Sequence, residues 1–488
     1  MSEVVRPAEP AQPGHQSFWL WVMCLTGVDY FSTLGYQPSI AFEAVGMLAP
    51  LATVVLVAVT LGCALPVYRK VAEDSPLGQG SIAMLERLLR GWPAKILVLV
   101  LLGFAATDFV ITKTLSAADA AEHLIHNPFW GDMPDVLQSQ MGVTMLLLVM
   151  LGAMFLRGFR EVIAVAVLIV GVYLALNAII IASGLVHLTM HPERFSAWLM
   201  AVESGNWHFE HEGEGWLAVA AACLLFFPKL ALGLSGFETG VAVMPLVEGH
   251  PDDDPAQPAG RIRNTQKLLT AAAIIMSLML LGSSIVTSML IDPVALVTEG
   301  QAANRALAYI AHGETGLVLN PLFGNVFGTM YDLSTVTILW FAGASAMSGL
   351  LNLVPRYLPR YGMAPRWAEA IRALVVVFTA INLFVTWWFD ARVEAQAGAY
   401  ATGVMVLMSS AALAVSIAEW RKRAGAWPGR VPWPYILATL VFFYTTVAII
   451  IEKPDGIKIA GAFVVSILVF SFVSRLQRST EMRFEKFD

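Results

Sequence analysis

The chain has 488 residues, of which 57% are hydrophobic and 14% are charged. Soluble proteins carry about 25% charged residues, so this composition excludes a soluble globular protein and indicates a polytopic membrane protein. The formal net charge of -6 excludes little by itself, because the distribution of charge along the chain is more informative than its sum.

Apolar stretches recur along the chain, and each has roughly the 20 residues that a helix needs to cross a bilayer. They predict an all-α fold with about twelve transmembrane helices. A polar N-terminal tail at 1–17 precedes them and lacks the features of a signal peptide. The predicted spans are 18–47, 50–68, 95–119, 141–157, 162–186, 216–247, 268–291, 322–351, 368–389, 396–418, 433–451 and 457–474.

Basic residues are distributed unevenly about these spans. Of the 30 Lys and Arg residues, 23 lie on the side of the two termini and 5 on the opposite side, while Lys113 and Lys229 lie inside spans. Since basic residues are retained in the cytoplasm, both termini are predicted to be cytoplasmic, in the inner or plasma membrane of the cell. The cytoplasmic connection at 69–94 is expected to hold a turn and a short amphipathic helix, and the polar loop at 250–260 to link two halves of the chain.

Three acidic residues, Asp29, Asp108 and Glu238, lie inside predicted spans. A carboxylate in the bilayer interior is costly, so each one is a hypothesis about function. Asp108, Thr112 and Ser116 follow one another at intervals of four residues and therefore share one stripe of a helix. Three oxygen ligands on one face suit a dehydrated monovalent cation. The alternative is that Thr112 and Ser116 hydrogen-bond to carbonyls of their own helix.

The first and sixth spans are predicted to be broken helices. Residues 27–38 and 233–245 each contain glycines, an acid, hydroxyl groups and then a proline, and glycine and proline weaken a helix. Such a pair in inverted topology is typical of secondary transporters whose substrate lies at the midplane. The alternative is an ordinary kink in each helix. The predicted hinge residues are Gly27, Gly35, Pro38, Gly233, Gly236 and Gly240.

Three segments of the chain resemble the signature segments of KUP-type potassium transporters, and the KimA-like branch of the amino acid–polyamine–organocation (APC) superfamily is the most similar. The segments are Gly27-Val28-Asp29-Tyr30 through Tyr36 and Pro38, Asp108-x3-Thr112-x3-Ser116, and Ser235-Gly236-Phe237-Glu238. The resemblance implies proton-coupled uptake of potassium, and it suggests a homodimer. The cation ligands and proton carriers that it implies are Asp29, Tyr36, Asp108, Thr112, Ser116, Ser235 and Glu238.

The same resemblance implies a LeuT-like 5+5 inverted repeat. Its halves are expected at 18–186 and 216–418, followed by two further helices at 433–474 and a cytoplasmic tail at 475–488. Relatives of this kind often carry a cytoplasmic C-terminal domain, for which this sequence shows no counterpart.

Two intramembrane lysines are a departure from that family's pattern. Lys113 and Lys229 are close in sequence to the implied ligands, and a lysine ammonium can replace a bound cation, so both are candidate modulators of binding or coupling. The alternatives are that Lys113 reaches towards the outer interface and that Lys229 forms a structural ion pair. Glu43, Asp119 and Asp332 are interpreted as vestibule or helix-end residues.

Other functions are less consistent with the sequence. The main alternative is an amino acid or amine–proton symporter of the same superfamily, although Asp29 at the first break would repel a substrate carboxylate. A potassium channel lacks support because no TVGYG-type filter loop occurs. No nucleophile–base pair, nucleotide-binding loop or cofactor motif is found, so neither an enzyme nor a nucleic-acid partner is expected. The His-rich stretch at 208–214 is interpreted as a solvated external loop.

Overall fold

The structure is a computed structural model, and it describes residues 16–484 except 76–77, 79, 89–91, 159–162, 208–212, 255–256, 298–299, 358–370 and 424–430. The His-rich stretch lies largely outside the described residues, as does most of the N-terminal tail. The described part is almost entirely helical, and its only β-type pairing is isolated backbone bridges. The predicted all-α fold is confirmed.

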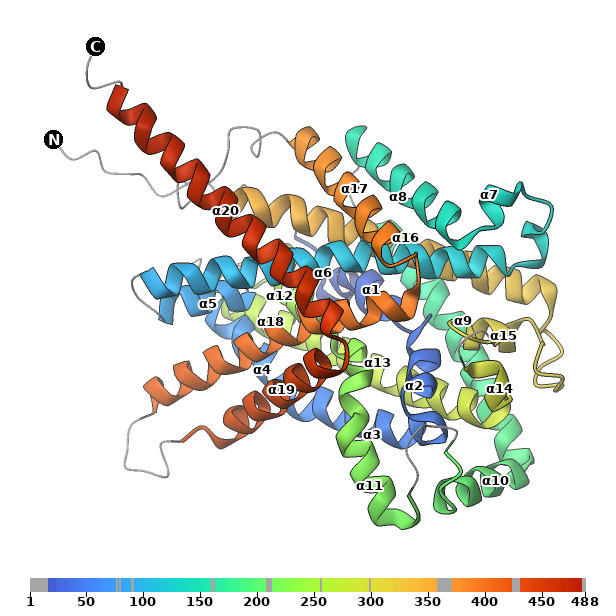
Figure 1. The fold of residues 1–488 in the computed structure, drawn as a ribbon. Helices are drawn as coiled ribbons and strands as arrows, with labels where there is room; N and C mark the ends of the chain where they lie inside the picture. The colour runs from blue at the N-terminus through green and yellow to red at the C-terminus, as the bar shows by residue number, and fades with distance from the viewer. Residues whose placement is uncertain are drawn as a thin grey trace.

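The α-helices are labelled in Figure 1. Their bounds are α1 Trp19–Ser32, α2 Gln37–Val45, α3 Ala49–Val59, α4 Leu65–Asp74, α5 Gly80–Leu88, α6 Trp92–Ile125, α7 Asp135–Gln138, α8 Gln140–Leu156, α9 Ile163–Met190, α10 Pro192–Glu203, α11 Gly215–Phe226, α12 Phe237–Ala242, α13 Ala259–Leu290, α14 Pro293–Leu296, α15 Ala306–Ala311, α16 Asn325–Tyr357, α17 Ile371–Trp388, α18 Val393–Lys422, α19 Trp433–Glu452 and α20 Pro454–Phe484.

Each of the twelve predicted spans coincides with one or more of these helices. Nine helical stretches in the described part of the chain are long and apolar enough to cross a membrane, and the first of them, Trp19–Asp74, contains the first two predicted spans. α8 is a shorter apolar helix. α20 continues to Phe484, ten residues beyond the predicted end of the last span at 474. The chain is therefore an all-α polytopic membrane protein.

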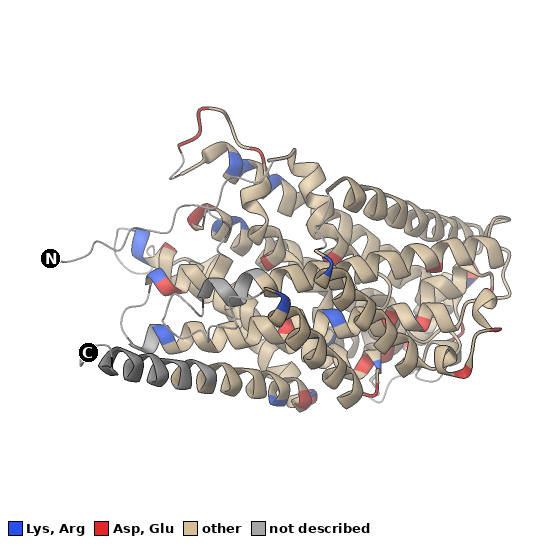
Figure 2. Cartoon of the chain, turned by 90° about the horizontal axis from the view of Figure 1, so that it is seen from above, with Lys and Arg blue, Asp and Glu red and all other residues tan. Residues whose placement is uncertain are grey.

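The long helices form one bundle with α6 in its middle (Figure 1). α6 packs against α8, α16, α18 and α20, and α1 packs against α9, α13 and α16. Among the short helices, α5 lies at the left of the view and α7, α14 and α15 lie at the right. Figure 2 shows Lys and Arg gathered towards the left end, which is the end predicted to be cytoplasmic.

The first predicted span is broken. α1 ends before residues 33–36, and α2 begins after them. Pro38 lies in the first turn of α2, and because it has no N–H, the carbonyl of Leu34 lacks the donor that a continuous helix would supply. Gly35 lies in the break as predicted, whereas Gly27 lies inside α1, outside the break.

The sixth span is also broken. After α11 the chain tightens into a 3-10 helix at Phe227–Leu234, which contains Gly233, and α12 begins after Gly236. Gly236 has a φ of 89°, a conformation that favours glycine. A Cβ atom at Gly236 would lie 2.7 Å from the ring of Tyr30, so the break is packed closely against α1. Gly240 lies within α12, after the break.

Hydrogen bonds join the two broken helices on both sides of their breaks. The amide of Gln37 in α2 donates to the carbonyl of Leu230 at 3.1 Å. The hydroxyl of Thr239 in α12 donates to the carboxylate of Asp29 in α1 at 3.2 Å. Polar side chains thus satisfy some of the groups that the broken helices leave free, as non-helical backbone at membrane depth requires.

The polar loop predicted at 250–260 is organised around Asp253. Its carboxylate accepts hydrogen bonds from the backbone amides of Gly260 at 2.9 Å and of His250 and Arg261 at 3.0 Å. These bonds, chiefly the one from Gly260, lower the pKa of the Asp253 carboxyl. The loop therefore caps the first turn of α13 with a charge that suits a helix N-terminus.

We predict that Gly236→Ala destabilises the protein by about 2–4 kcal/mol, from backbone strain at positive φ and overpacking against Tyr30. The measurement is the unfolding temperature of the purified protein in detergent, followed by tryptophan fluorescence.

Gly215→Ala is the matched control. Gly215 has a similar φ of 82°, but no atom lies within 4 Å of a Cβ built there. This variant should lose only about 1–2 kcal/mol, the strain contribution alone. Equal losses in the two variants would show that the contact with Tyr30 contributes nothing.

Candidate cation-binding site

Asp29 lies in the last turn of α1, directly before the first break. Its carboxylate accepts the hydrogen bond from Thr239 on α12, so it bridges the two broken helices. Thr239 was not among the predicted site residues, although it directly follows Glu238. Among the residues that the structure describes, no Lys, Arg or His forms an ion pair with Asp29.

Asp108 lies on α6 and faces α18. A Cβ built at Gly403 of α18 would lie 3.2 Å from the Cβ of Asp108, so glycine at this position lets the two helices approach at the carboxylate. Oδ1 of Asp108 is buried and has no hydrogen-bond partner. Asp108 also lies within electrostatic range of Asp29 and Glu238, so the structure brings the predicted carboxylates into one region.

Hydroxyl groups surround Asp29 and Asp108. Tyr36 is buried in the first break, within electrostatic range of both carboxylates. Ser235 is buried at the second break, and its hydroxyl has no hydrogen-bond partner. Tyr400 of α18 is buried near Asp29, Asp108, Tyr36 and the Ser235 hydroxyl.

Tyr400 is a site residue that the sequence analysis missed. It is the one large side chain in the run of small residues at 397–403. This contrast is the signal that could have identified it, because small residues in a membrane helix allow close helix packing.

The hydroxyl groups of Thr112 and Ser116 on α6 are only partly available to a ligand. The hydroxyl of Thr112 donates a hydrogen bond to the carbonyl of Asp108 at 2.8 Å. This is the alternative considered for Thr112, a hydrogen bond to a carbonyl of its own helix. Its oxygen retains lone pairs that can still accept or coordinate. Ser116 is buried one turn further along α6.

Glu238 binds the N-terminus of α5. Its Oε1 accepts hydrogen bonds from the backbone amide of Ser81 at 2.9 Å and from the Ser81 hydroxyl at 3.0 Å. A carboxylate at this end of a helix is favoured by the orphan amides and the helix dipole. Tyr68 of α4 is buried beside the same carboxylate. Ser81 and Tyr68 were not predicted as site residues.

Lys113 does not reach towards the outer interface, which was the alternative considered for it. Its side chain is only 1% exposed, with Nζ 3.5 Å from the sulfur of Met347 and 5.4 Å from the ring centroid of Phe378. Lys113 therefore points between α16 and α17, because five helical residues turn its side chain well away from the direction of Asp108.

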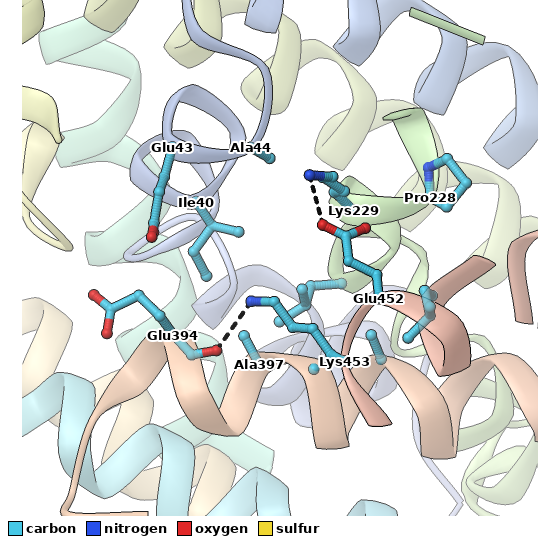
Figure 3. A pocket seen from close by; sticks show the side chains of 13 residues that line it. Ile40, Glu43, Ala44, Pro228, Lys229, Glu394, Ala397, Glu452 and Lys453 are labelled. Atoms are coloured by element: carbon cyan, nitrogen blue, oxygen red, sulfur yellow. Dashed lines mark hydrogen bonds and ion pairs between the residues drawn. The ribbon is translucent and has the colours of Figure 1, made fainter. Parts of the chain in front are cut away.

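Lys229 forms an ion pair with Glu452 at 2.5 Å, which is the structural alternative considered for it. Both residues line a cavity of about 130 Å³ at the end of the bundle where α18 begins and α19 ends. Figure 3 shows this cavity with Lys229 and Glu452 on one side and Glu394 on the other. Lys453 also lines it and donates to the backbone carbonyl of Glu394 at 3.3 Å.

Three further acids were interpreted as vestibule or helix-end residues. Glu43 is exposed and lines the cavity at α18 and α19, which we call the vestibule, as that interpretation states. Asp119 and Asp332 are instead buried inside α6 and α16. For Asp119 the reason is that α6 continues to Ile125, beyond the predicted end of its span at 119. The interpretation was wrong for these two.

The donor set at Asp29 and Asp108 consists of carboxylate and hydroxyl oxygens. No cluster of three His, Cys, Asp or Glu side chains with metal-binding geometry occurs among the described residues. Oxygen ligands of this kind suit hard cations, whereas nitrogen and sulfur ligands suit softer transition metals.

The comparisons with known proteins identify a fold. No protein-family model matches the chain, and no curated protein matches it. The structure is similar to a crystal structure of the manganese transporter of Eremococcus coleocola in complex with an aromatic bis-isothiourea-substituted compound. The TM-score is 0.52 with 10% sequence identity, over 98% of this chain and 99% of that chain.

A crystal structure of a mutant of the same transporter is similar to the same degree, with a TM-score of 0.52 and 10% identity over 96% of this chain and 97% of that one. The chain has a transporter fold. At 10% identity the likeness concerns the fold alone, so it supports a transporter architecture without distinguishing the KUP-type family from others.

We predict that Lys113→Met leaves the protein equally stable or more stable in detergent, by up to about 3 kcal/mol, because it removes a buried ammonium that has no carboxylate partner among the described residues. Unfolding temperature measured at neutral pH checks this.

Lys229→Met is the matched control, since it leaves the carboxylate of Glu452 without its close ion pair. It should lower the unfolding temperature. A fall for Lys113→Met as large as that for Lys229→Met would show that Lys113 has a stabilising charge partner.

Proposed function

We propose that the chain is a secondary active transporter that carries potassium or a similar monovalent cation, with proton coupling, by alternating access. The observation that carries the proposal is the meeting of Asp29, Asp108 and three buried hydroxyl residues where two helices are broken. A half-buried carboxylate pair with no basic partner among the described residues favours a mobile cation or a proton that neutralises it.

The ligand chemistry favours a monovalent cation. Neutral hydroxyls of Tyr36, Ser235 and Tyr400 outnumber the two carboxylates, and such oxygens replace the hydration shell of a weakly hydrated ion. Divalent calcium and magnesium sites depend more heavily on carboxylates. Polyamines and amino acids are the remaining alternative, but Asp29 at the first break would repel a substrate carboxylate.

Access to the site from opposite ends of the bundle is proposed to alternate. The vestibule between Lys229 and Glu394 is lined by apolar residues including Ile40, Leu232 and Ala401, and its lining does not include Asp29 or Asp108. At the opposite end, α5 is held to α12 by Glu238 and Ser81. A rocking movement of the helix bundle around the breaks would open one end while closing the other.

The direction of transport follows from the charge distribution. The end that holds α5 and most of the basic residues is proposed to be cytoplasmic, so the vestibule faces outside. A cation that enters through the vestibule then gains about 2.3 kcal/mol per 100 mV of membrane potential, inside negative. An acidic exterior adds a second driving force if protons travel in the same direction.

We predict that Asp29→Asn and Asp108→Asn each reduce rubidium uptake by about tenfold or more, because each removes a charge that offsets dehydration of the cation. The measurement is radioactive rubidium uptake into liposomes that contain the purified full-length chain, with an inside-negative potential.

Glu43→Gln is the matched control, since Glu43 is an exposed carboxylate of the vestibule and should change uptake less than about threefold. Competition by potassium, manganese(II) or amino acids identifies the substrate class. Full uptake in both aspartate variants would rule out this site, and uptake of manganese(II) or an amino acid without rubidium would replace potassium as the substrate.

A further inference from the structure

Asp119 is a buried carboxylate without a polar partner. It lies on α6, eleven residues after Asp108, and is 0% exposed. Neither of its two carboxylate oxygens has a hydrogen-bond partner. Buried polar groups are nearly always hydrogen-bonded, so a carboxylate with both oxygens free requires an explanation.

The carboxylate of Asp119 lies against the first helix break. A Cβ built at Gly35 would lie 3.0 Å from Oδ2 of Asp119 and 3.4 Å from the side chain of Thr335. Any residue larger than glycine at position 35 would therefore press on the carboxylate. The break also contains the carbonyl of Leu34, which lacks a helical donor because of Pro38.

A proton suits this location better than a metal cation. Asp119 lines neither the vestibule nor the small cavity beside Tyr30 and Gly236, and it is packed directly against Gly35. An ionised carboxylate here would be uncompensated, because no basic residue pairs with it among the described residues. A proton neutralises it without needing extra space.

A buried histidine network continues from Asp119 towards α15. His123 follows Asp119 by one helical turn, and its Nδ1 hydrogen-bonds to Oδ1 of Asp332 at 2.9 Å. Asp332 also binds Nε2 of His312 at 2.8 Å and accepts from the amide of Asn127 at 2.8 Å.

The other ring nitrogens, Nε2 of His123 and Nδ1 of His312, are buried without partners. If the bonded nitrogens carry the hydrogen, each histidine has a bare nitrogen that can accept a proton. The carboxylate of Asp332 then offsets the positive charge of whichever histidine is protonated.

Charged and titratable groups face Asp119 and the histidine network from every element packed against them. Those around Asp119 are His123 and Glu122 on α6, Tyr36 in the break, Tyr173 on α9, Tyr331 on α16 and Glu394 on α18. Glu122 pairs with His126 at 3.4 Å. Arg305, which also lies near His123, is paired with Glu314 at 3.1 Å.

We propose that Asp119 is a proton-binding site that links the external face to the first helix break. The proton enters from water at the α15 end, passes through the buried network of His312, Asp332 and His123, and then crosses to a carboxylate oxygen of Asp119, which lies one helical turn from His123 without a direct hydrogen bond to it. Release of the proton restores the negative charge of Asp119 beside Gly35 and Tyr36. This charge favours movement of the break or of the cation. This inference rests on the proposed function only in its coupling step.

The first test is transport by the full-length chain in liposomes. Asp119→Asn should lower acid-driven rubidium uptake by about tenfold or more, while rubidium exchange at equal pH, which needs only the cation site, should change less than about threefold. Glu122→Gln is the matched control on the same helix, because that carboxylate is partnered by His126, and it should retain acid-driven uptake. Unchanged acid-driven uptake in Asp119→Asn would overturn the proposal.

The second test reads protonation directly and does not need transport. Infrared difference spectra of the purified chain between acidic and alkaline pH should show a carboxylic acid band that Asp119→Asn removes and Glu122→Gln keeps. If the wild type carries no rubidium, the proposed function fails, yet this band still decides whether Asp119 binds a proton.

Gly35→Ala covers the case in which Asp119→Asn does not fold. It displaces the carboxylate of Asp119 and should shift the same infrared band. Absence of any such band in the wild type, or an identical band in Gly35→Ala, would overturn the proposal.

Discussion

The half-buried carboxylates of Asp29 and Asp108 lie in an apolar bundle where no basic residue pairs with them among the described residues. This absence is the constraint on which the remaining architecture of the site depends. Under the proposed function, charge that is not matched inside the protein is matched by a cation or a proton that arrives from outside, which would link the stability of the folded bundle to ligand binding. The helix breaks also contribute to the site. They place near the carboxylates oxygen atoms that a continuous helix would use in its own hydrogen bonds.

Glu238 connects this region to the end of the bundle that holds α5. Its Oε1 accepts both hydrogen bonds from Ser81, whereas its Oε2 is buried without a hydrogen-bond partner, so one oxygen holds α5 while the other can answer to charge at the carboxylate site. A change of charge near Asp108 therefore alters the hold of α12 on α5 through electrostatics alone. In the proposed transport cycle, access and occupancy are then coupled through the two oxygens of one side chain, with no need for a long pathway of packed residues.

Much of the fold could be predicted from the sequence, because length and apolarity determine membrane spans and because glycine and proline at 27–38 and 233–245 indicate breaks. The contacts of the site could not. Thr239 meets Asp29 across 210 residues and Ser81 meets Glu238 across 157 residues, and no local pattern encodes such pairs. Asp119 was misinterpreted because its position at the predicted end of the span suggested exposure, whereas α6 continues to Ile125.

The periodicity of α6 explains why the carboxylate site keeps its negative charge despite a lysine nearby. The residue four positions after Asp108 shares its face of the helix and is Thr112, which is neutral. Lys113 comes one position later, and at about 100° per residue it points away, between α16 and α17. A lysine at position 112 would form an internal ion pair with Asp108 and take the place of a mobile cation. In the proposed function, the register of one residue on one helix thus decides whether the site can bind and release a cation.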